Sequence, residues 1–213
     1  MSESSNKSIQ RTANIAAADA ERCMMKKIFI ILLILIISAP IACWAWYKPI
    51  RVIYPEWVDG ISCNQEGICI DDMSKIVKAS SLYKNALHSV STEVGSFKQN
   101  PHVIFCSTQE CFESFGFKKA AAMSVSSLGI VISPRGWDGH FVRHEMIHHR
   151  QAEELGLLSG ILKPEWLIEG MAYSLSFDPR IQLADRWQND RIKFEAWYQK
   201  IGKKQLWKEA SKL

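Results

Sequence analysis

The strongest feature of the hydrophobic pattern is an uninterrupted apolar run near the N-terminus, from Ile28 to Tyr47. The run holds no charged side chain, two lysines precede it, and tryptophan and tyrosine gather at its far end. A helix of this length spans about 30 Å, the thickness of the hydrocarbon core of a bilayer, and such aromatic residues are typical of the membrane interface. We therefore predict a cytoplasmic tail (1–27), a single-pass membrane anchor (28–47) and an exported domain (48–213).

Other interpretations of this run stay open. A cleaved signal peptide fits the strongly apolar residues from Ile28 to Ile37. Pro40 lies three positions before Cys43, where cleavage requires a small residue, so cleavage there and acylation of Cys43 are both disfavoured. A buried core helix would need a polar face toward water, which the run lacks. Translation from Met24 or Met25 would place the run at the start of an exported protein.

Beyond residue 47 the pattern alternates between helical and strand-like periods, which predicts an α+β domain with a small sheet and a helical C-terminus. Helical spacing covers residues 73–97, 110–115, 141–158 and 164–177, and one or two amphipathic helices are expected over 181–213. Short apolar runs predict strands over 103–106, 121–125 and 129–133. The expected buried face of the first helix consists of Ile76, Val77, Leu82, Leu87 and Val90.

Composition and charge narrow the class of protein. Of the 213 residues, 47% are hydrophobic and 23% are charged, as in ordinary globular proteins, which excludes wholesale disorder. The formal net charge of +4 is not concentrated in any block or stripe of basic residues. We therefore expect no nucleic-acid partner.

Four cysteines of the predicted domain form two close pairs, Cys63 with Cys69 and Cys106 with Cys111. All four follow the predicted anchor, and a domain outside the cytoplasm meets an oxidising compartment. We therefore expect two disulfides, 63–69 and 106–111, and a periplasmic or extracellular location for the domain. Four free thiols remain an alternative, whereas a cysteine-based zinc cluster is disfavoured because CxxC spacing is missing.

The segment HEMIH, residues 144–148, lies within the helix predicted over 141–158. Histidines four positions apart share one helical face, so the imidazoles of His144 and His148 can reach one metal ion. Neutral imidazole suits zinc, and Glu145 beside the first ligand can act on a water molecule at the metal. This motif alone is moderately specific, and a pair of packed helices without a metal is the alternative.

A third ligand is predicted on the following helix, in the segment WLIEGMAY (166–173). Two antiparallel helices joined by a loop that contains glycine and proline would bring Glu169 back opposite the histidines. A carboxylate in an apolar segment needs a partner, and catalytic zinc takes three protein ligands while a fourth position stays open. We therefore expect His144, His148 and Glu169 to bind one zinc ion (Zn²⁺). The small residues Gly170 and Ala172 would let the helices approach closely at the metal.

Together, HEMIH and WLIEGMAY resemble the gluzincin branch of zinc metallopeptidases, in which the third ligand is a glutamate on the helix after HExxH. The likeness extends back to residue 101. PHVIFCSTQECFESFG is similar to the opening of membrane-associated gluzincin-like domains, and LGIVISP is similar to the strand before their active-site helix. The resemblance implies a zincin-like fold, that strand as the substrate-binding edge of the sheet, and Glu145 as the general base of peptide hydrolysis.

The chain departs from this family pattern at Tyr173, where some members carry an aspartate that orients a ligand histidine. No residue is marked as the stabiliser of an oxyanion, and Tyr173, Tyr198, His140 and several arginines are candidates. The simpler interpretation of His140 and His149 is that they are bystanders, since His149 faces away from the stripe formed by His144 and His148. Trp166 and Tyr173 are more simply explained as packing residues.

The resulting prediction is a membrane-anchored zinc peptidase that acts on exported peptides or proteins. No acidic motif for binding a substrate amine precedes HEMIH, which favours an endopeptidase over an aminopeptidase. A catalytically silent, membrane-tethered zinc-binding module is the alternative. A structural zinc site would need a fourth protein ligand, and the sequence offers no convincing one.

Overall fold

The computed structural model describes residues 24–39 and 42–213, and the chain divides into two compact units, Met1–Tyr47 and Lys48–Leu213. The first residues of the expected cytoplasmic tail, 1–23, and the proline at position 40 lie outside the described residues. Each unit has its own internal contacts. The two units are therefore described separately.

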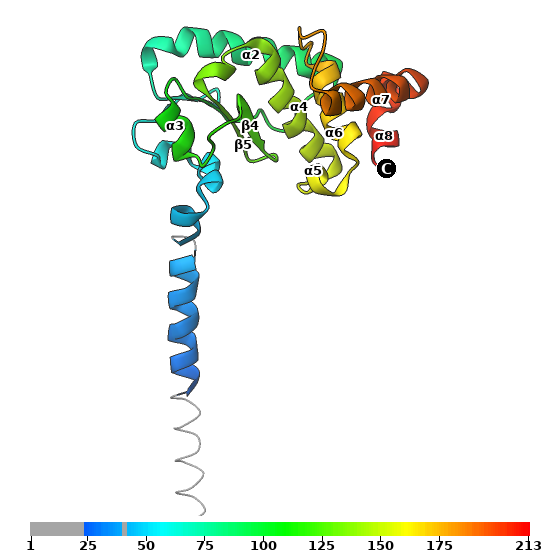
Figure 1. Cartoon of the computed structure of the whole chain (residues 1–213). Helices are drawn as coiled ribbons and strands as arrows, with labels where there is room; N and C mark the ends of the chain where they lie inside the picture. The colour runs from blue at the N-terminus through cyan, green and yellow to red at the C-terminus, as the bar shows by residue number, and fades with distance from the viewer. Residues whose placement is uncertain (1–23, 40–41) are drawn as a thin grey trace, which may run out of the picture. The chain divides into compact units, whose positions relative to one another are not determined.

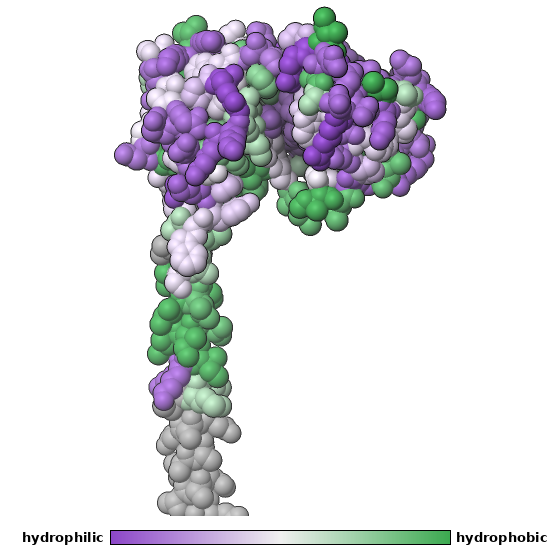
Figure 2. Space-filling model, viewed as in Figure 1, coloured by the Kyte–Doolittle hydropathy of each residue, from purple (hydrophilic) through white to green (hydrophobic). Residues whose placement is uncertain are grey.

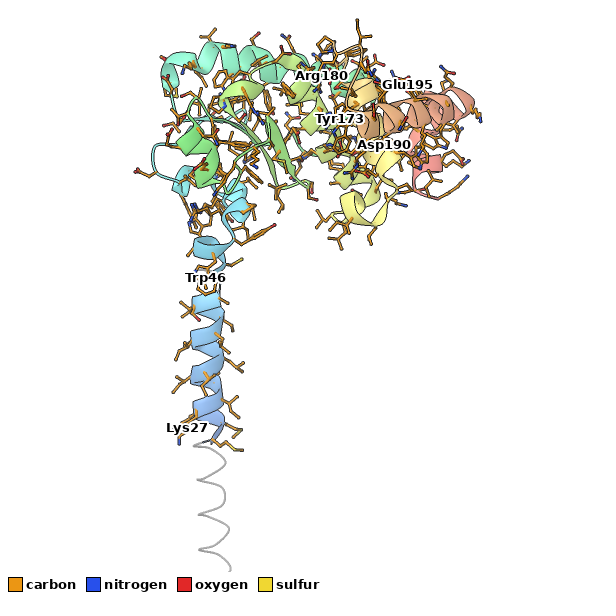
Figure 3. All side chains as sticks on the ribbon, in the orientation of Figure 1. Lys27, Trp46, Tyr173, Arg180, Asp190 and Glu195 are labelled. Atoms are coloured by element: carbon orange, nitrogen blue, oxygen red, sulfur yellow. A yellow bond between two sulfur atoms is a disulfide. The ribbon has the colours of Figure 1, made fainter. Side chains whose placement is uncertain are left out.

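The first unit contains one helix, Met24–Trp46, that is long and apolar enough to cross a membrane. Lys27 and Trp46 lie toward its two ends (Figure 3). None of the described side chains in its most apolar stretch is buried, in contrast to the core helix of a soluble protein. The helix begins four residues before the expected run and fits either a membrane anchor or a signal sequence.

The second unit is built around a five-stranded mixed sheet in the order β1-β2-β3-β5-β4. Figure 1 labels the strands β4 and β5 of this sheet. The strands are β1 (Ser62–Cys63), β2 (Ile68–Ile70), β3 (Val103–Phe105), β4 (Ala122–Val125) and β5 (Gly129–Ile132). Strands β2, β3 and β5 run parallel, while β1 and β4 pair antiparallel at the two edges. The edge beside the candidate site is therefore β4, and the expected edge strand, 129–133, lies inside the sheet instead.

The parallel strands are apolar on both faces, as a sheet covered on both sides requires. Their register places the side chains of 68, 70, 103, 105, 130 and 132 on one face, where they join the main core. Ile104 and Val131 are buried on the opposite face. There Gly129 lies against Val52 of the 3-10 helix η1 (Lys48–Ile53), and a β-carbon added at this glycine would lie 3.0 Å from the valine side chain.

Helix α2 (Ile76–Glu93) covers the main core, but its buried face differs from the expected one. The buried residues are Ala79, Tyr83, Ala86 and Val90, which recur at helical spacing. Val77 is 79% exposed, so its inclusion in the apolar face was wrong. Two alanines in the buried stripe allow α2 to approach the sheet and helix α4 closely, which a sequence pattern that weights large apolar residues does not detect.

The histidine motif lies on helix α4 (Gly139–Leu155). Asp138 caps its N-terminus by accepting the backbone N–H of His140. The helix ends at Leu155, three residues before the expected end at 158, and Gly156 after it adopts a positive φ of 97°. A short helix, α5 (Ser159–Leu162), and helix α6 (Glu165–Leu175) follow, and α6 packs against α4.

Helices α7 (Asp185–Ile201) and α8 (Leu206–Ala210) complete the C-terminal part, which is helical as expected. Gly170 of α6 packs against α7: an added β-carbon there would lie 2.3 Å from the carbonyl oxygen of Asp190. The small residue at 170 thus serves the α6–α7 contact, and its expected role in bringing α6 to α4 was wrong.

Two disulfides link neighbouring elements of this unit. Cys63 of β1 is bonded to Cys69 of β2, and Cys106, the residue after β3, is bonded to Cys111 of helix α3 (Gln109–Ser114). These are the two pairings expected from the sequence. Strands β1 and β2 themselves were not predicted, because two or three residues are too few to establish a hydrophobic period.

Candidate metal centre

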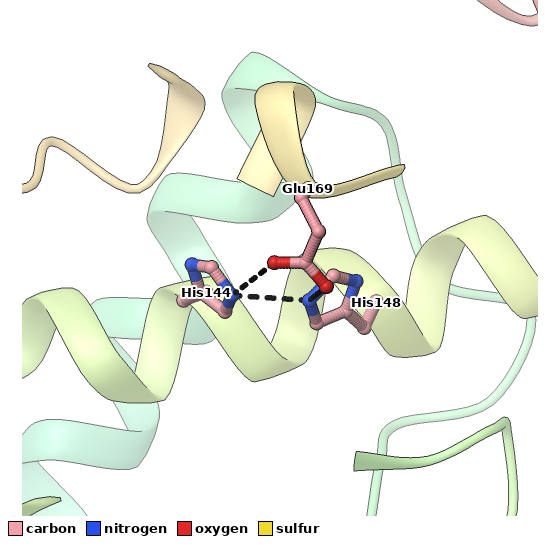
Figure 4. A group of neighbouring side chains, drawn as sticks. All are labelled: His144, His148 and Glu169. Carbon is pink, nitrogen blue, oxygen red and sulfur yellow. Dashed lines mark hydrogen bonds and ion pairs between the residues drawn. The ribbon is translucent and has the colours of Figure 1, made fainter. Parts of the chain in front are cut away.

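His144, His148 and Glu169 come together where α4 faces α6 (Figure 4). One ligand atom from each residue lies within 4.8 Å of the other two, the one such group among the described residues. The Nε2 atoms of the two histidines are 3.0 Å apart, and each lies 3.6 Å from a carboxylate oxygen of Glu169. The structure thus unites all three residues predicted as ligands.

These distances fit a single zinc ion. Bonds of about 2.0–2.1 Å in tetrahedral directions separate ligand atoms by about 3.3 Å, close to the separations found here. All three side chains are partly buried. The donor set consists of two imidazole nitrogen atoms and one carboxylate, a combination that catalytic zinc accepts. A zinc ion held by these three residues would keep a fourth position for water or substrate.

Gln151 fixes the orientation of His148, a role that the sequence analysis missed. Its side-chain amide donates to the carbonyl oxygen of Ile168, 2.9 Å away, which leaves the amide oxygen 2.9 Å from Nδ1 of His148. Nδ1–H therefore donates to Gln151, and the lone pair of Nε2 is free for a metal. The i, i+3 spacing of 148 and 151 on one helix was the available signal.

Glu145 points from α4 toward the edge strand β4 and is buried. Burial raises the pKa of its carboxyl to about 7, although the charge of His148 and the donated backbone N–H of Ser124 oppose this rise. Burial likewise favours the neutral form of Glu169, but the hydrogen bond from His144 and the charge of His148 outweigh it. The pKa of Glu169 consequently lies below its usual value. The two carboxyl groups are thereby suited to different tasks.

A cleft of about 510 Å³ borders the ligands. Residues of the β4 segment line one side, and the opposite side is lined by residues of α4, α5 and α6. The acidic residues in its lining are Glu145, Glu169 and Asp178, and the last is paired with Arg180.

The cleft contains some of the candidate stabilisers of an oxyanion and not others. Tyr173, His140 and Arg180 line it, whereas Tyr198 stacks on Phe194 in the core. The ring of Tyr173 meets the ring of His144 edge-on at 4.6 Å, so it packs against a candidate ligand at the position where some gluzincins carry an aspartate. Burial raises the pKa of Tyr173 to about 12, so its hydroxyl remains a hydrogen-bond donor.

Arg180 lies beyond α6 and reaches back to this tyrosine (Figure 3). Its guanidinium carbon is 5.8 Å from the centre of the Tyr173 ring, and its Nε is 2.9 Å from Asp178. No local sequence signal marks this contact, because Asp178 and Arg180 lie in an irregular loop.

The remaining residues considered in the sequence have structural roles. His149 faces away from the cleft toward Phe97 and Glu153. Nδ1 of His140 lies 2.7 Å from Asp138, and Trp166 packs edge-on against Trp197. Comparison of the chain with protein-family models, with curated proteins and with solved structures gave no match.

Proposed function

We propose that this protein is a zinc-dependent peptidase of the gluzincin type. The observation that carries the proposal is the placement of three ligand atoms within 4.8 Å of one another, beside a cleft and next to a buried carboxyl group. The HExxH spacing of 144–148 and a glutamate on the following helix support the same assignment. A zinc ion in this site would supply Lewis acidity toward a carbonyl oxygen and toward water.

Glu145 would serve as the proton carrier of peptide hydrolysis. Its carboxylate accepts a proton from the attacking water while the water oxygen bonds to the scissile carbon. The same group then delivers this proton to the leaving nitrogen as the carbon–nitrogen bond breaks. A carboxyl group that gains and loses a proton near neutral pH suits both halves of the cycle, and burial raises the pKa of Glu145 in that direction.

Strand β4 would hold the substrate backbone. It is an edge strand whose residues line the cleft, so an extended peptide can pair with its outward-facing amides and carbonyls. Among the described residues that line the cleft, Asp178 is the one carboxylate beyond Glu145 and Glu169, and it is paired with Arg180, so these residues offer no free acidic anchor for an amino terminus. We therefore favour an endopeptidase.

We further propose that the helix Met24–Trp46 is retained as an anchor, with the domain 48–213 outside the cytoplasm. Two disulfides within the domain support an oxidising compartment. Protease treatment of sealed cells that carry a tag after Leu213 should remove the tag, and the mature protein should keep residues 24–46. A tag that resists protease until the membrane is opened would place the domain in the cytoplasm.

The catalytic role is tested by the variant Glu145→Gln. It should keep zinc, because no ligand changes, but its cleavage of an unfolded protein substrate should fall about 10²-fold or more. Glu154→Gln removes a partly exposed carboxylate of the same helix and should cleave normally. Full activity of Glu145→Gln would remove Glu145 as the base. A wild-type chain that binds zinc but cleaves no peptide would favour the silent zinc-binding module.

A further inference from the structure

The most prominent exposed apolar feature of the domain is the tip between α4 and α6. It consists of Leu157, Leu158, Ile161 and Leu162, all largely exposed, with Ile161 82% exposed and Leu162 72% exposed. Figure 2 shows it as a green patch beneath α5. Large apolar side chains gathered on a protruding loop mark an interaction site in a soluble domain.

The area of this tip argues against a protein partner. Four side chains fall well short of the roughly 800 Å² that each partner buries in a stable protein–protein interface. A tip of this size suits shallow insertion at a lipid interface, where binding grows with the apolar area that enters the headgroup and acyl boundary.

The charge around the tip also suits lipid. No acidic residue occurs from Gly156 to Pro164, and the segment carries Lys163. The Lys163 ammonium donates to the carbonyl oxygen of Ser211, which brings the end of α8 and its exposed Lys208 near the tip. Basic residues beside an apolar tip are attracted to anionic headgroups.

The helix of the first unit accounts for a bilayer close to the domain. A single residue, Tyr47, separates the helix Met24–Trp46 from η1 of the domain, so a membrane that this helix spans is always within reach of the domain surface. Within the domain, η1 and α5 both lie at the lower edge in Figure 1, whereas α2 lies at the upper edge. The point where the chain enters the domain and the apolar tip therefore belong to one end of it.

We propose that the α5 tip inserts into the surface of the bilayer and forms a second membrane contact of the domain. Leu157 and Ile161 also line the cleft, so the inserted tip sets one end of the cleft at the headgroup level. If the proposed peptidase function holds, the preferred substrates are polypeptide segments at the membrane surface.

The test uses the full chain reconstituted into vesicles of phosphatidylcholine and phosphatidylglycerol. The photo-crosslinking residue p-benzoylphenylalanine replaces Ile161, or Leu158 as a second site, and in the control it replaces Val77, which is 79% exposed on α2. After illumination, the two tip variants should yield several-fold more lipid adduct than the Val77 variant, as measured by mass spectrometry.

Equal lipid labelling at the tip and at Val77 would overturn the proposal, and so would crosslinks from the tip to a second copy of the chain. Having two tip positions guards against misfolding of one variant, which thermal unfolding would reveal. The zinc content of the same samples reports on the metal centre separately. A failure of membrane insertion is thus distinguishable from a failure of the proposed function.

Discussion

Histidines on two faces of helix α4 each lie beside a glutamate, from α6 on one face and from α4 itself on the other, and the two clusters differ in the partners of the carboxylate. On the cleft side, Glu169 faces two imidazole nitrogens at 3.6 Å. On the back, Glu153 lies 3.7 Å from Nε2 of His149 but also accepts the backbone N–H groups of Lys98 and Gln99 at 3.1 Å. Its other oxygen is 3.0 Å from Arg150.

The comparison shows that protein donors decide which cluster can bind a metal. Glu153 already accepts hydrogen bonds from two backbone N–H groups and pairs with the positive charge of Arg150. A cation at Glu153 would have to displace these donors, which stabilise the fold. Among the described residues, Glu169 pairs closely with the two histidines, whose Nε2 atoms can bind a metal once Nδ1 carries the proton. The cleft cluster (His144, His148 and Glu169) is therefore suited to binding a metal. The back cluster (His149, Arg150, Glu153 and Glu154) connects the 97–99 loop to α4.

The largest expected difference follows from removing each carboxylate in turn. Glu169→Ala deletes a proposed ligand, so the full-length protein should lose its zinc, while the thermal unfolding of the metal-free protein changes little. Glu153→Ala should keep zinc and unfold at a lower temperature, because three donors lose their acceptor. Metal analysis and thermal unfolding of both variants measure this difference. The reverse outcome would show that the clusters have been assigned to the wrong roles.

A smaller effect should follow from Gln151→Ala on the cleft side. The substitution leaves all three ligands in place but frees His148 to rotate, so zinc affinity should fall about 10- to 100-fold. Competition with a zinc chelator measures the affinity. An unchanged affinity would mean that the contact with Gln151 does not position the ligand.

The smallest effects concern the back cluster and distinguish its two acidic residues. Glu153→Gln should reduce the free energy of unfolding by about 1–3 kcal/mol, because this nearly buried side chain accepts hydrogen bonds from charged and backbone donors. Glu154→Gln breaks a partly exposed contact with Arg150 and should cost less than about 1 kcal/mol. Denaturant unfolding provides both values. A larger cost for Glu154→Gln would contradict the assignment of Glu153 as the centre of the back cluster.

The sequence was sufficient to predict that the three candidate ligands lie together, because their geometry is mostly local. His144 and His148 lie on one face of any helix that contains them, and a short connection between two helices returns Glu169 to that face. Long, periodic segments such as α4 and α6 were predicted for the same reason.

Features that depend on contacts between distant segments could not be predicted. Arg180 reaches Tyr173 from an irregular loop, and β4 is the edge strand only because β5 pairs with β3. The contact of Gly170 with α7 depends on how two helices cross. In each case the residue type permits several partners, and the packing of the whole domain selects one.

The zinc content of the purified full-length chain, compared with that of the double variant His144→Ala/His148→Ala, tests the central claim most directly. The metal centre described here predicts about one zinc per wild-type chain, because three ligands and one open position make a complete catalytic site. It predicts no retained zinc in the double variant. Stoichiometric zinc in the double variant would show that the metal is held elsewhere and would contradict the proposed centre.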